Sequence, residues 1–346
     1  MANFITRFRN LIVDSYRGKK IMHYLLKSFI FTKNPVYRYL CLKDIRNKIP
    51  SLEKLPVFVT IENTNLCNLS CIFCANEQMA RKRGFMDDNL FKSIIDQCVY
   101  HGIPNVLVQG FGEPLLDKDY VSKIRLAKEK GIKFVHCVTN GVLLNKALSE
   151  ELINAGLDYI YISIDAATPE VYSQVHHLPS KQIPSDDFFT IVENIEQLIN
   201  IKKKNRTKKP FIEVRFKDFE LNKKDLICFM DKYRGRVDKV NIYMNITNWP
   251  GSTIRNNLPR VRMLKFPCFN LWSTLYVSYE GKVSLCCQDY ECKVVIGDVK
   301  KESLIEIWNG HKLKNFRTLH LENKFDEISI CGDCVVNTHL VTPWWQ

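Results

Sequence analysis

Asn65-Leu-Cys67-Asn-Leu-Ser-Cys71-Ile-Phe-Cys74-Ala75 is the stretch that decides the fold of this 346-residue chain. Its cysteines are separated by three and then two residues. A short loop without Pro or Gly brings their thiolates to one side of a single cubane iron-sulfur cluster. A cubane has four irons, so three cysteines leave one iron without a protein ligand. An open coordination position on a redox centre is typical of a catalytic site.

A zinc knuckle is the alternative for this three-cysteine loop. It would need a fourth Cys or His close by in the sequence, and the nearest, Cys98 and His101, lie more than twenty residues farther on. We therefore favour the cluster and keep a non-catalytic zinc-binding protein as an alternative.

From Pro56 onward, short β-branched runs alternate with amphipathic stretches, which indicates repeated β/α units and a parallel sheet. We expect strands at residues 57–62, 105–109, 133–138, 159–164, 211–216 and 239–243. We expect helices between them at residues 87–100, 118–130, 146–155, 188–204 and 223–233. This α/β pattern predicts a partial (β/α)6 TIM-like barrel, whose working face is the carboxyl end of the strands. The three-cysteine loop follows the first strand and therefore lies at that face.

Small and polar residues follow the later strands at the same face. Gly112 and Glu113 follow the second strand, and a glycine there lets the backbone approach a ligand closely. Ser163 and Asp165 end the fourth strand, and Arg215 on the fifth can grip a carboxylate with two donors.

At these residues the chain resembles the radical S-adenosylmethionine enzymes, including the aromatic Phe73 before the third cysteine. Phe111 stands where the Gly-Gly-Glu motif of that family has its first glycine. The resemblance implies a [4Fe-4S] cluster whose open iron chelates S-adenosylmethionine, and cleavage of the sulfonium to a 5′-deoxyadenosyl radical. It also implies a reductant of the flavodoxin or ferredoxin type. The cofactor-binding candidates are Gly112, Glu113, Ser163, Asp165 and Arg215.

Three other polar residues receive no role at this face. His176 and His177 lie in a predicted irregular stretch at residues 174–187, where paired histidines are commonly exposed. Asn222 opens the next helix and is expected to cap it.

A second group of cysteines follows a change of pattern near residue 250. Alternating runs at residues 274–279 and 282–285 predict a β-hairpin, and a helix is expected at residues 303–319. The four sulfurs around these elements suffice for one fully ligated cubane or a zinc ion, and they belong to Cys268, Cys286, Cys331 and Cys334.

This segment resembles the SPASM and twitch extensions of radical S-adenosylmethionine enzymes, which hold auxiliary iron-sulfur clusters. No cysteine follows Cys334, which favours the shorter twitch form with one auxiliary [4Fe-4S] cluster. Cys287 could replace Cys286 as a ligand, and the sequence leaves that choice open. A fully ligated cluster would serve as an electron relay.

The resemblance implies oxidation or epimerisation of a small substrate, such as the carbinol of a sugar or an aminocyclitol. Cys287 and Cys292 are the weak thiol candidates for an epimerisation, and the alternative for both is a buried apolar role. A peptide maturase is the alternative enzyme class.

Charge and composition set the remaining expectations. Residues 1–50 carry eleven Lys or Arg against two Asp, out of a net charge of +13 for the chain. We expect a basic helical extension at residues 1–55 that docks on the main domain, with an anionic membrane surface or an acidic partner as the alternative. The basic run at residues 202–209 has no interleaved aromatics, which argues against nucleic acid.

The cysteines and the lack of targeting signals suggest where the protein works. Seven of the thirteen cysteines fall in the two metal-like groups, which fits a reducing cytoplasm. No secretory signal and no run of eighteen apolar residues is found. We divide the chain into the extension at 1–55, a barrel core at 56–250 and an auxiliary cluster domain at 260–346.

Overall fold

The computed structural model describes residues 35–176, 186–244, 265–332 and 334. The helices are α4 (Pro35–Leu52), α5 (Asp88–His101), α6 (Tyr120–Glu129), α7 (Lys146–Asn154), α8 (Pro169–His176), α9 (Asp186–Lys204), α10 (Leu226–Tyr233), α11 (Asn270–Ser273), α12 (Leu304–Trp308) and α13 (His311–Leu321). Short 3-10 helices are η1 (Ala75–Gln78), η2 (Pro114–Leu116), η3 (Lys223–Asp225) and η4 (Phe325–Glu327). The strands are β1 (Phe58–Ile61), β2 (Asn105–Val108), β3 (Phe134–Thr139), β4 (Tyr159–Ser163), β5 (Phe211–Asp218), β6 (Lys239–Met244), β7 (Thr274–Val277), β8 (Lys282–Ser284) and β9 (Val295–Asp298).

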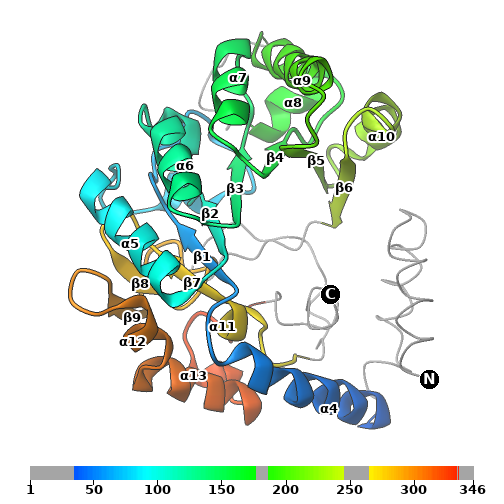
Figure 1. Cartoon of the computed structure of the whole chain (residues 1–346). Helices are drawn as coiled ribbons and strands as arrows, with labels where there is room; N and C mark the ends of the chain where they lie inside the picture. The colour runs from blue at the N-terminus through cyan, green and yellow to red at the C-terminus, as the bar shows by residue number, and fades with distance from the viewer. Residues whose placement is uncertain (1–34, 177–185, 245–264, 333, 335–346) are drawn as a thin grey trace.

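All nine of these strands join one sheet, in the order β6-β5-β4-β3-β2-β1-β7-β8-β9. Strands β1 to β6 pair in parallel, and helices lie between them along the chain. The strands form a curved row with α5, α6, α7, α9 and α10 on its convex side (Figure 1). This arrangement confirms the predicted partial barrel.

Alternation along the strands explains which side of the sheet the helices cover. In β4, Ile160 and Ile162 are fully buried, whereas Tyr159, Tyr161 and Ser163 are half-buried. Successive side chains of a strand point to opposite faces. The isoleucines therefore form the core under the helices, where each contributes about 1.5–3 kcal/mol. The tyrosines and the serine point to the concave face, which leads up to the working end of the barrel.

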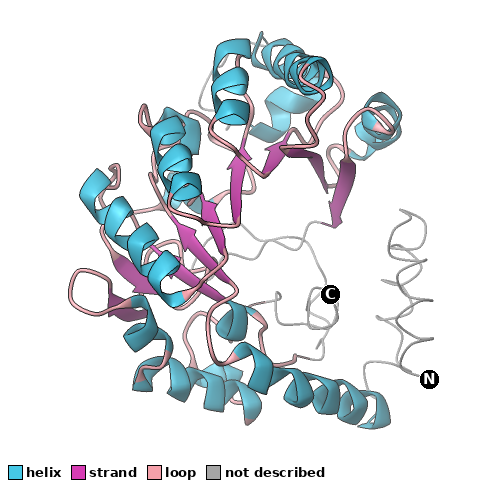
Figure 2. Cartoon of the chain, viewed as in Figure 1, coloured by secondary structure: helices cyan, strands magenta, loops and turns pink. Residues whose placement is uncertain are grey.

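The predicted hairpin is confirmed as β7 and β8, with Tyr276 opposite Ser284. The hairpin is not separate from the barrel, because β7 pairs in parallel with β1 and Thr60 lies opposite Tyr276. The third strand of this part, β9, was not expected from the sequence. In Figure 2, where the strands are magenta, β7 lies next to β1 in the same sheet.

The helix expected at residues 303–319 is two helices, α12 and α13. A capping box of Ser303 and Glu306 begins α12, and the chain turns at Asn309 and Gly310 before α13. Glycine weakens a helix interior because its backbone loses more freedom on ordering. The break is therefore located at the glycine.

The end of α4 docks on the carboxyl-terminal part of the chain. Glu53 accepts hydrogen bonds from two buried indoles. The indole of Trp272 donates to its carboxylate at 3.3 Å, and the indole of Trp308 donates to its backbone carbonyl at 2.8 Å. The guanidinium of Arg317 lies 4.2 Å from the ring centroid of Trp308. The first 34 residues of the predicted basic extension, and His177, lie outside the described residues.

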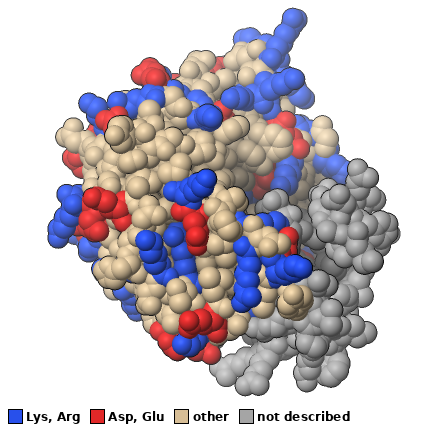
Figure 3. All heavy atoms as spheres, turned by 60° about the horizontal axis from the view of Figure 1, so that its bottom comes forward, with Lys and Arg blue, Asp and Glu red and all other residues tan. Residues whose placement is uncertain are grey.

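Two surface properties complete the description. Within the described ranges, no helix has the length and apolar character needed to cross a membrane. On the face shown in Figure 3, Lys and Arg side chains are interspersed with Asp and Glu side chains.

Candidate functional site

The three-cysteine loop leaves β1 and ends at η1, where Cys74 is the N-cap and its sulfur accepts from the backbone N–H of Asn76 at 3.5 Å. Two backbone hydrogen bonds hold the loop against α8. The N–H of Ser70 donates to the carbonyl of His176, and the N–H of Ile72 donates to the carbonyl of Val175. The loop therefore lies at the carboxyl end of the strands, as predicted.

The three cysteines are half-buried, and their thiols lie close enough to one another for their charges to interact. Burial, followed by the charges of Cys74 and Cys67, raises the pKa of Cys71 well above its usual value. Burial likewise raises the pKa of Cys67 to about 12. Among the described residues, no three His, Cys, Asp or Glu side chains surround the position of a single metal ion. The ligands of a cubane bind different irons and so stand farther apart than the ligands of one ion.

His176 is a residue of this site that the sequence reasoning missed. It ends helix α8 and is 1% exposed, so the expectation of an exposed loop histidine is wrong. Its Nδ1 lies 3.1 Å from the sulfur of Cys71, and its Nε2 donates to the carbonyl oxygen of Ile164 at 2.7 Å. The imidazole therefore bridges the three-cysteine loop and the end of β4.

Glu113 is buried between the loop and the end of β3. Its carboxylate accepts from the hydroxyl of Thr139 and the backbone N–H of Asn140, both at 2.7 Å. Burial raises the pKa of Glu113 to about 7, although these hydrogen bonds act to lower it. A Cβ on Gly112 would lie 2.3 Å from the carbonyl oxygen of Leu66. Glycine at 112 is therefore required by the close approach of the chain's own three-cysteine loop.

The end of β4 is held by the buried Asp165, whose backbone is left-handed at φ 58°. Its carboxylate accepts from the hydroxyl of Ser163 at 3.0 Å and from the backbone N–H of Lys217 at 2.6 Å. Asn222 occupies the N-cap position of η3, as expected, but its side chain makes no capping bond and donates instead to the backbone oxygens of Asp165 and Lys217. Asp165 thus joins β4 to β5.

Arg215 lies beside Ser163 on the concave face, because the two are register partners. Its guanidinium lies 3.6 Å from the ring centroid of Tyr161 and 5.1 Å from that of Tyr243. Its Nε donates to the buried carboxylate of Glu213 at 2.7 Å. These contacts fix the orientation of Arg215 within the barrel.

The four cysteines of the carboxyl-terminal part line one cavity, together with His320, the amides of Asn270 and Gln288, and apolar side chains. They are Cys268, Cys286, Cys331 and Cys334. Cys287 is not part of this lining. Burial, followed by the charges of neighbouring cysteines, raises the pKa values of Cys268 and Cys286 well above their usual range. The sulfur of Cys286 also accepts from the backbone N–H of Gln288 at 3.4 Å.

Neither of the two thiols considered for epimerisation lines this cavity, although the sulfur of Cys287 accepts from the amide of the lining residue Asn270 at 3.8 Å. Cys287 packs against a small apolar cluster that contains Phe111 and Tyr276. Burial raises the pKa of Cys292 to about 11, even though the charge of Arg81 lowers it. Burial likewise raises the pKa of Cys287, so neither environment favours a thiolate.

An ion pair connects the two cysteine regions. The guanidinium of Arg81 binds both carboxylate oxygens of the fully buried Glu62, at 2.7 and 2.5 Å, and its Nε donates to the carbonyl of Tyr290 at 2.7 Å. The backbone N–H groups of Ala80 and Arg81 donate to the carboxylate of Glu291. The segment after the three-cysteine loop is thus fastened to the loop that follows Cys286.

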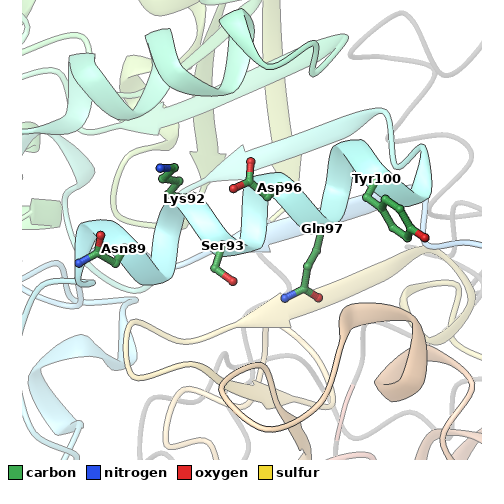
Figure 4. A pocket seen from close by; sticks show the side chains of 6 residues that line it. All are labelled: Asn89, Lys92, Ser93, Asp96, Gln97 and Tyr100. Carbon is green, nitrogen blue, oxygen red and sulfur yellow. The ribbon is translucent and has the colours of Figure 1, made fainter.

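A groove of about 360 Å³ lies away from these residues, on the surface of α5. Figure 4 shows its lining, which comes from a single helix and includes none of the predicted site residues. Two lining side chains are already engaged, since Asp96 pairs with Lys130 and Gln97 accepts from the backbone of Leu304. The groove therefore helps to dock α12 on the barrel.

Comparisons with known proteins agree with this geometry. The model of the radical SAM superfamily matches residues 61–208, and that of the SPASM iron-sulfur cluster-binding domain matches residues 268–335. The structure of BtrN in complex with AdoMet and 2-DOIA has a TM-score of 0.55 at 19% identity, covering 81% of this chain and 93% of BtrN. Native anSMEcpe with bound AdoMet has a TM-score of 0.60 at 14% identity, covering 83% of this chain and 91% of its own.

Curated relatives match a shorter part. The probable GTP 3′,8-cyclase of Methanocaldococcus jannaschii is 31% identical over 173 residues, which are 49% of this chain and 53% of that protein. The GTP 3′,8-cyclase of Limosilactobacillus fermentum is 36% identical over 128 residues, which are 36% of this chain and 38% of that protein. The chain thus spans about half or less of the length of these relatives.

The two matched domains imply a [4Fe-4S] cluster with S-adenosylmethionine and an auxiliary iron-sulfur cluster. The donor sets fit these groups, because soft thiols gather at two separate places and sulfur is the preferred ligand of iron-sulfur clusters. The matched domains together cover more than half of the chain. The chain belongs to the radical SAM superfamily and carries a carboxyl-terminal SPASM-type iron-sulfur cluster domain.

Proposed function

We propose that this protein is a radical SAM oxidoreductase that oxidises or epimerises a carbinol of a small substrate, such as a sugar or an aminocyclitol. The observation that carries the proposal is the contrast between three thiols at the open end of the strands and four thiols around one cavity. In this proposal residues 56–250 form the catalytic core, residues 260–346 hold the auxiliary cluster, and residues 1–55 form the extension.

Cys67, Cys71 and Cys74 would hold the cluster that binds S-adenosylmethionine, and Cys268, Cys286, Cys331 and Cys334 the auxiliary cluster. When bound, these groups supply a radical that takes one hydrogen atom from the substrate carbon and an acceptor for one electron, while the hydroxyl proton leaves to a base. The substrate thereby becomes a ketone. Cys286 is preferred to Cys287 because it lines the cavity with the other three.

The chain's own polar residues would position the cofactor. The Glu113 carboxylate lies beside the three-cysteine loop, where it would accept from the ammonium of the methionine half. Ser163 on β4 and Arg215 on β5 are register partners, and they would contact hydroxyl or carboxylate groups of the cofactor. Asp165 would act indirectly, because its carboxylate already holds Ser163 and the backbone of β5.

The substrate would enter the concave face, where tyrosines and charged side chains gather on β4 to β6. Glu213 accepts there from the hydroxyl of Tyr159 and the amide of Asn241, and it pairs with Lys239 at 3.3 Å. Such a surface suits a polar substrate. BtrN, which shares this fold, was solved with AdoMet and 2-DOIA bound, in support of a small-molecule substrate.

A nucleotide substrate is the second candidate. It is favoured by the similarity of the core to GTP 3′,8-cyclases and by three basic side chains on β5 and β6, which are Arg215, Lys217 and Lys239. A peptide substrate, as in a maturase, stays an alternative that rests on the sequence resemblance.

The test is anaerobic reconstitution with iron and sulfide, followed by incubation with S-adenosylmethionine, a chemical reductant or a reduced flavodoxin, and candidate substrates. We expect about eight irons per chain and formation of 5′-deoxyadenosine. Sugars and aminocyclitols, GTP and peptides are supplied in parallel, and product mass identifies the class. A protein that holds only zinc and never cleaves S-adenosylmethionine would contradict the proposal.

A further inference from the structure

His320 lies on α13 and is fully buried in the wall of the four-cysteine cavity. The backbone N–H of Cys268 donates to its Nδ1 at 3.2 Å. A backbone N–H can only donate, so Nδ1 must offer its lone pair. The hydrogen of the neutral ring is therefore on Nε2.

The Nε2 atom of His320 is buried and has no hydrogen-bond partner among the described residues. An unsatisfied buried donor costs about 1–3 kcal/mol, so such groups in native proteins usually have a partner. Phe325 fixes the ring orientation by an edge contact, with centroids 5.0 Å apart at 79°. The cavity around the imidazole is lined by the four cysteines, by the apolar side chains of Leu271, Leu285 and Ile330, and by the amides of Asn270 and Gln288. Neither amide is a hydrogen-bond partner of Nε2.

We propose that the Nε2–H of His320 donates a hydrogen bond to a sulfur of the auxiliary cluster, and that this bond sets the cluster's reduction potential. The inference rests on the proposed function, which assigns that cluster to the four cysteines around the cavity. Hydrogen bonds to the sulfurs are among the factors that tune iron-sulfur potentials. Donation to sulfur stabilises the more negative, reduced cluster, so it raises the potential and favours acceptance of an electron from the substrate.

Ligation of iron by His320 is the other chemistry that a buried imidazole offers, and the hydrogen bond from Cys268 opposes it. A neutral histidine that binds metal through Nε2 carries its hydrogen on Nδ1. That hydrogen would face the N–H of Cys268, so two donors would oppose each other. Donation through Nε2 satisfies both nitrogens, which makes His320 a positioning and tuning residue rather than a ligand.

Two variants distinguish the roles of the two ring nitrogens of His320. His320→Asn keeps an acceptor near the Nδ1 position, for Cys268, and loses the Nε2 donor. His320→Gln places an amide donor near the Nε2 position and loses the acceptor for Cys268. Both are made in the full chain, reconstituted with iron and sulfide, and compared with the wild type by redox titration monitored by electron paramagnetic resonance. The auxiliary signal is identified as the one that Cys331→Ala removes.

In His320→Asn we expect the ratio of reduced to oxidised auxiliary cluster at a fixed potential to fall about tenfold, which is about 59 mV for one electron. We expect His320→Gln to stay near the wild type and both variants to retain their iron. An unchanged potential in His320→Asn would overturn the proposal, as would a larger effect in His320→Gln than in His320→Asn. Loss of iron in both variants would indicate ligation and overturn it too.

The outcome for the wild type separates this inference from the proposed function. If the wild type holds two clusters and the His320 variants behave like it, the tuning role fails and the proposed function stands. If the wild type holds zinc at the four cysteines, the auxiliary cluster and the role of His320 fail together.

Discussion

The three-cysteine loop and the four-cysteine cavity use the same ligand type in different surroundings. The loop lies at the strand ends beside Glu113, and the imidazole of His176 contacts the sulfur of Cys71 itself. The cavity is lined by the cysteines together with apolar and amide side chains, and the imidazole of His320 accepts a hydrogen bond from the backbone N–H of Cys268. Each region has a cysteine sulfur that accepts a hydrogen bond from a backbone N–H two residues later in the chain. These sulfurs belong to Cys74 and Cys286.

In the proposed function, these two surroundings suit two different tasks. A loop with three sulfurs among polar strand ends leaves room for a ligand on its cluster. In the proposed function, the four sulfurs around the cavity would complete the coordination of the auxiliary cluster and leave electron transfer as its task. The Arg81–Glu62 pair fastens the two regions together.

The largest effect is expected from Cys71→Ala. Removing one of three sulfurs leaves the cluster with too few ligands, so cleavage of S-adenosylmethionine should fall below detection, by more than about a thousandfold. 5′-Deoxyadenosine is measured by chromatography, and the iron content should drop to about four per chain. The exposed cysteine variant Cys228→Ala is the matched control and should behave like the wild type. Full activity in Cys71→Ala would show that the open cluster lies elsewhere.

Cys331→Ala should separate the two tasks. Cleavage of S-adenosylmethionine should stay within about twofold of the wild type, while formation of oxidised product should fall by about a hundredfold or more. Both products are measured in the same reaction. Normal product formation in this variant would rule out the electron relay, and loss of cleavage would show that the two regions are not independent.

Arg81→Met tests the connection between the regions. Loss of the guanidinium leaves the Glu62 carboxylate buried without its partner, and the free energy of unfolding should fall by about 3–5 kcal/mol. Chemical denaturation monitored by circular dichroism measures it. The double variant Arg81→Met with Glu62→Gln should recover part of the loss, because no charge remains buried. Equal stabilities of the single variant and the wild type would mean that the pair is dispensable.

Glu113 should give binding of S-adenosylmethionine a pH dependence. Burial raises its pKa to about 7, so the carboxyl is protonated below that pH and must lose its proton to accept from an ammonium. Affinity should therefore weaken by up to about tenfold per pH unit below 7 and level off above it. Isothermal titration across pH 5.5–8.5 measures it, and Glu113→Gln should bind weakly at every pH. A flat wild-type profile would contradict the role of Glu113.

The same raised pKa predicts a change in stability. The folded protein binds the proton of Glu113 more tightly than the unfolded chain does. Its contribution to stability is therefore greatest below the unfolded pKa and decreases as pH rises from about 4.5 to about 7. The free energy of unfolding of Glu113→Gln, measured by chemical denaturation, should not show this decrease.

His176→Phe should have the smallest effect. The contact between Nδ1 and the sulfur of Cys71 is lost while an aromatic ring stays in place, so iron at the first site should be lost several-fold faster to a chelator. Optical absorbance follows the loss, and the auxiliary cluster should be unaffected. His311→Phe, at an exposed position of α13, is the control. Equal rates in the two variants would remove His176 from the site.

Local sequence patterns predicted much of the fold, because strand alternation and cysteine spacing are local properties. They also placed Ser163 at the end of the fourth strand and Arg215 on the fifth, and the structure makes the two residues register partners. The pairing of β7 with β1 joins residues more than two hundred positions apart, and no local pattern indicates it. The Arg81–Glu62 pair was missed for a different reason, because a charged residue in a short loop is usually exposed.

The two buried histidines did leave a signal that went unused. Pro169 followed by Glu170 is typical of a helix start, and it would have placed His176 on α8 rather than in a loop. His320 shares the helical spacing of the buried Leu313 and Arg317, which indicates an inward-facing position. Which atom each imidazole contacts depends on tertiary packing and required the structure.

The central claim is that one cluster has an iron open to S-adenosylmethionine and the other does not. Electron paramagnetic resonance of the reduced, fully reconstituted protein, recorded with and without S-adenosylmethionine, tests it directly. The account predicts that one of two cluster signals changes on addition, and that this signal is absent in Cys71→Ala and retained in Cys331→Ala. A spectrum that stays the same, or one in which both signals change, would contradict it.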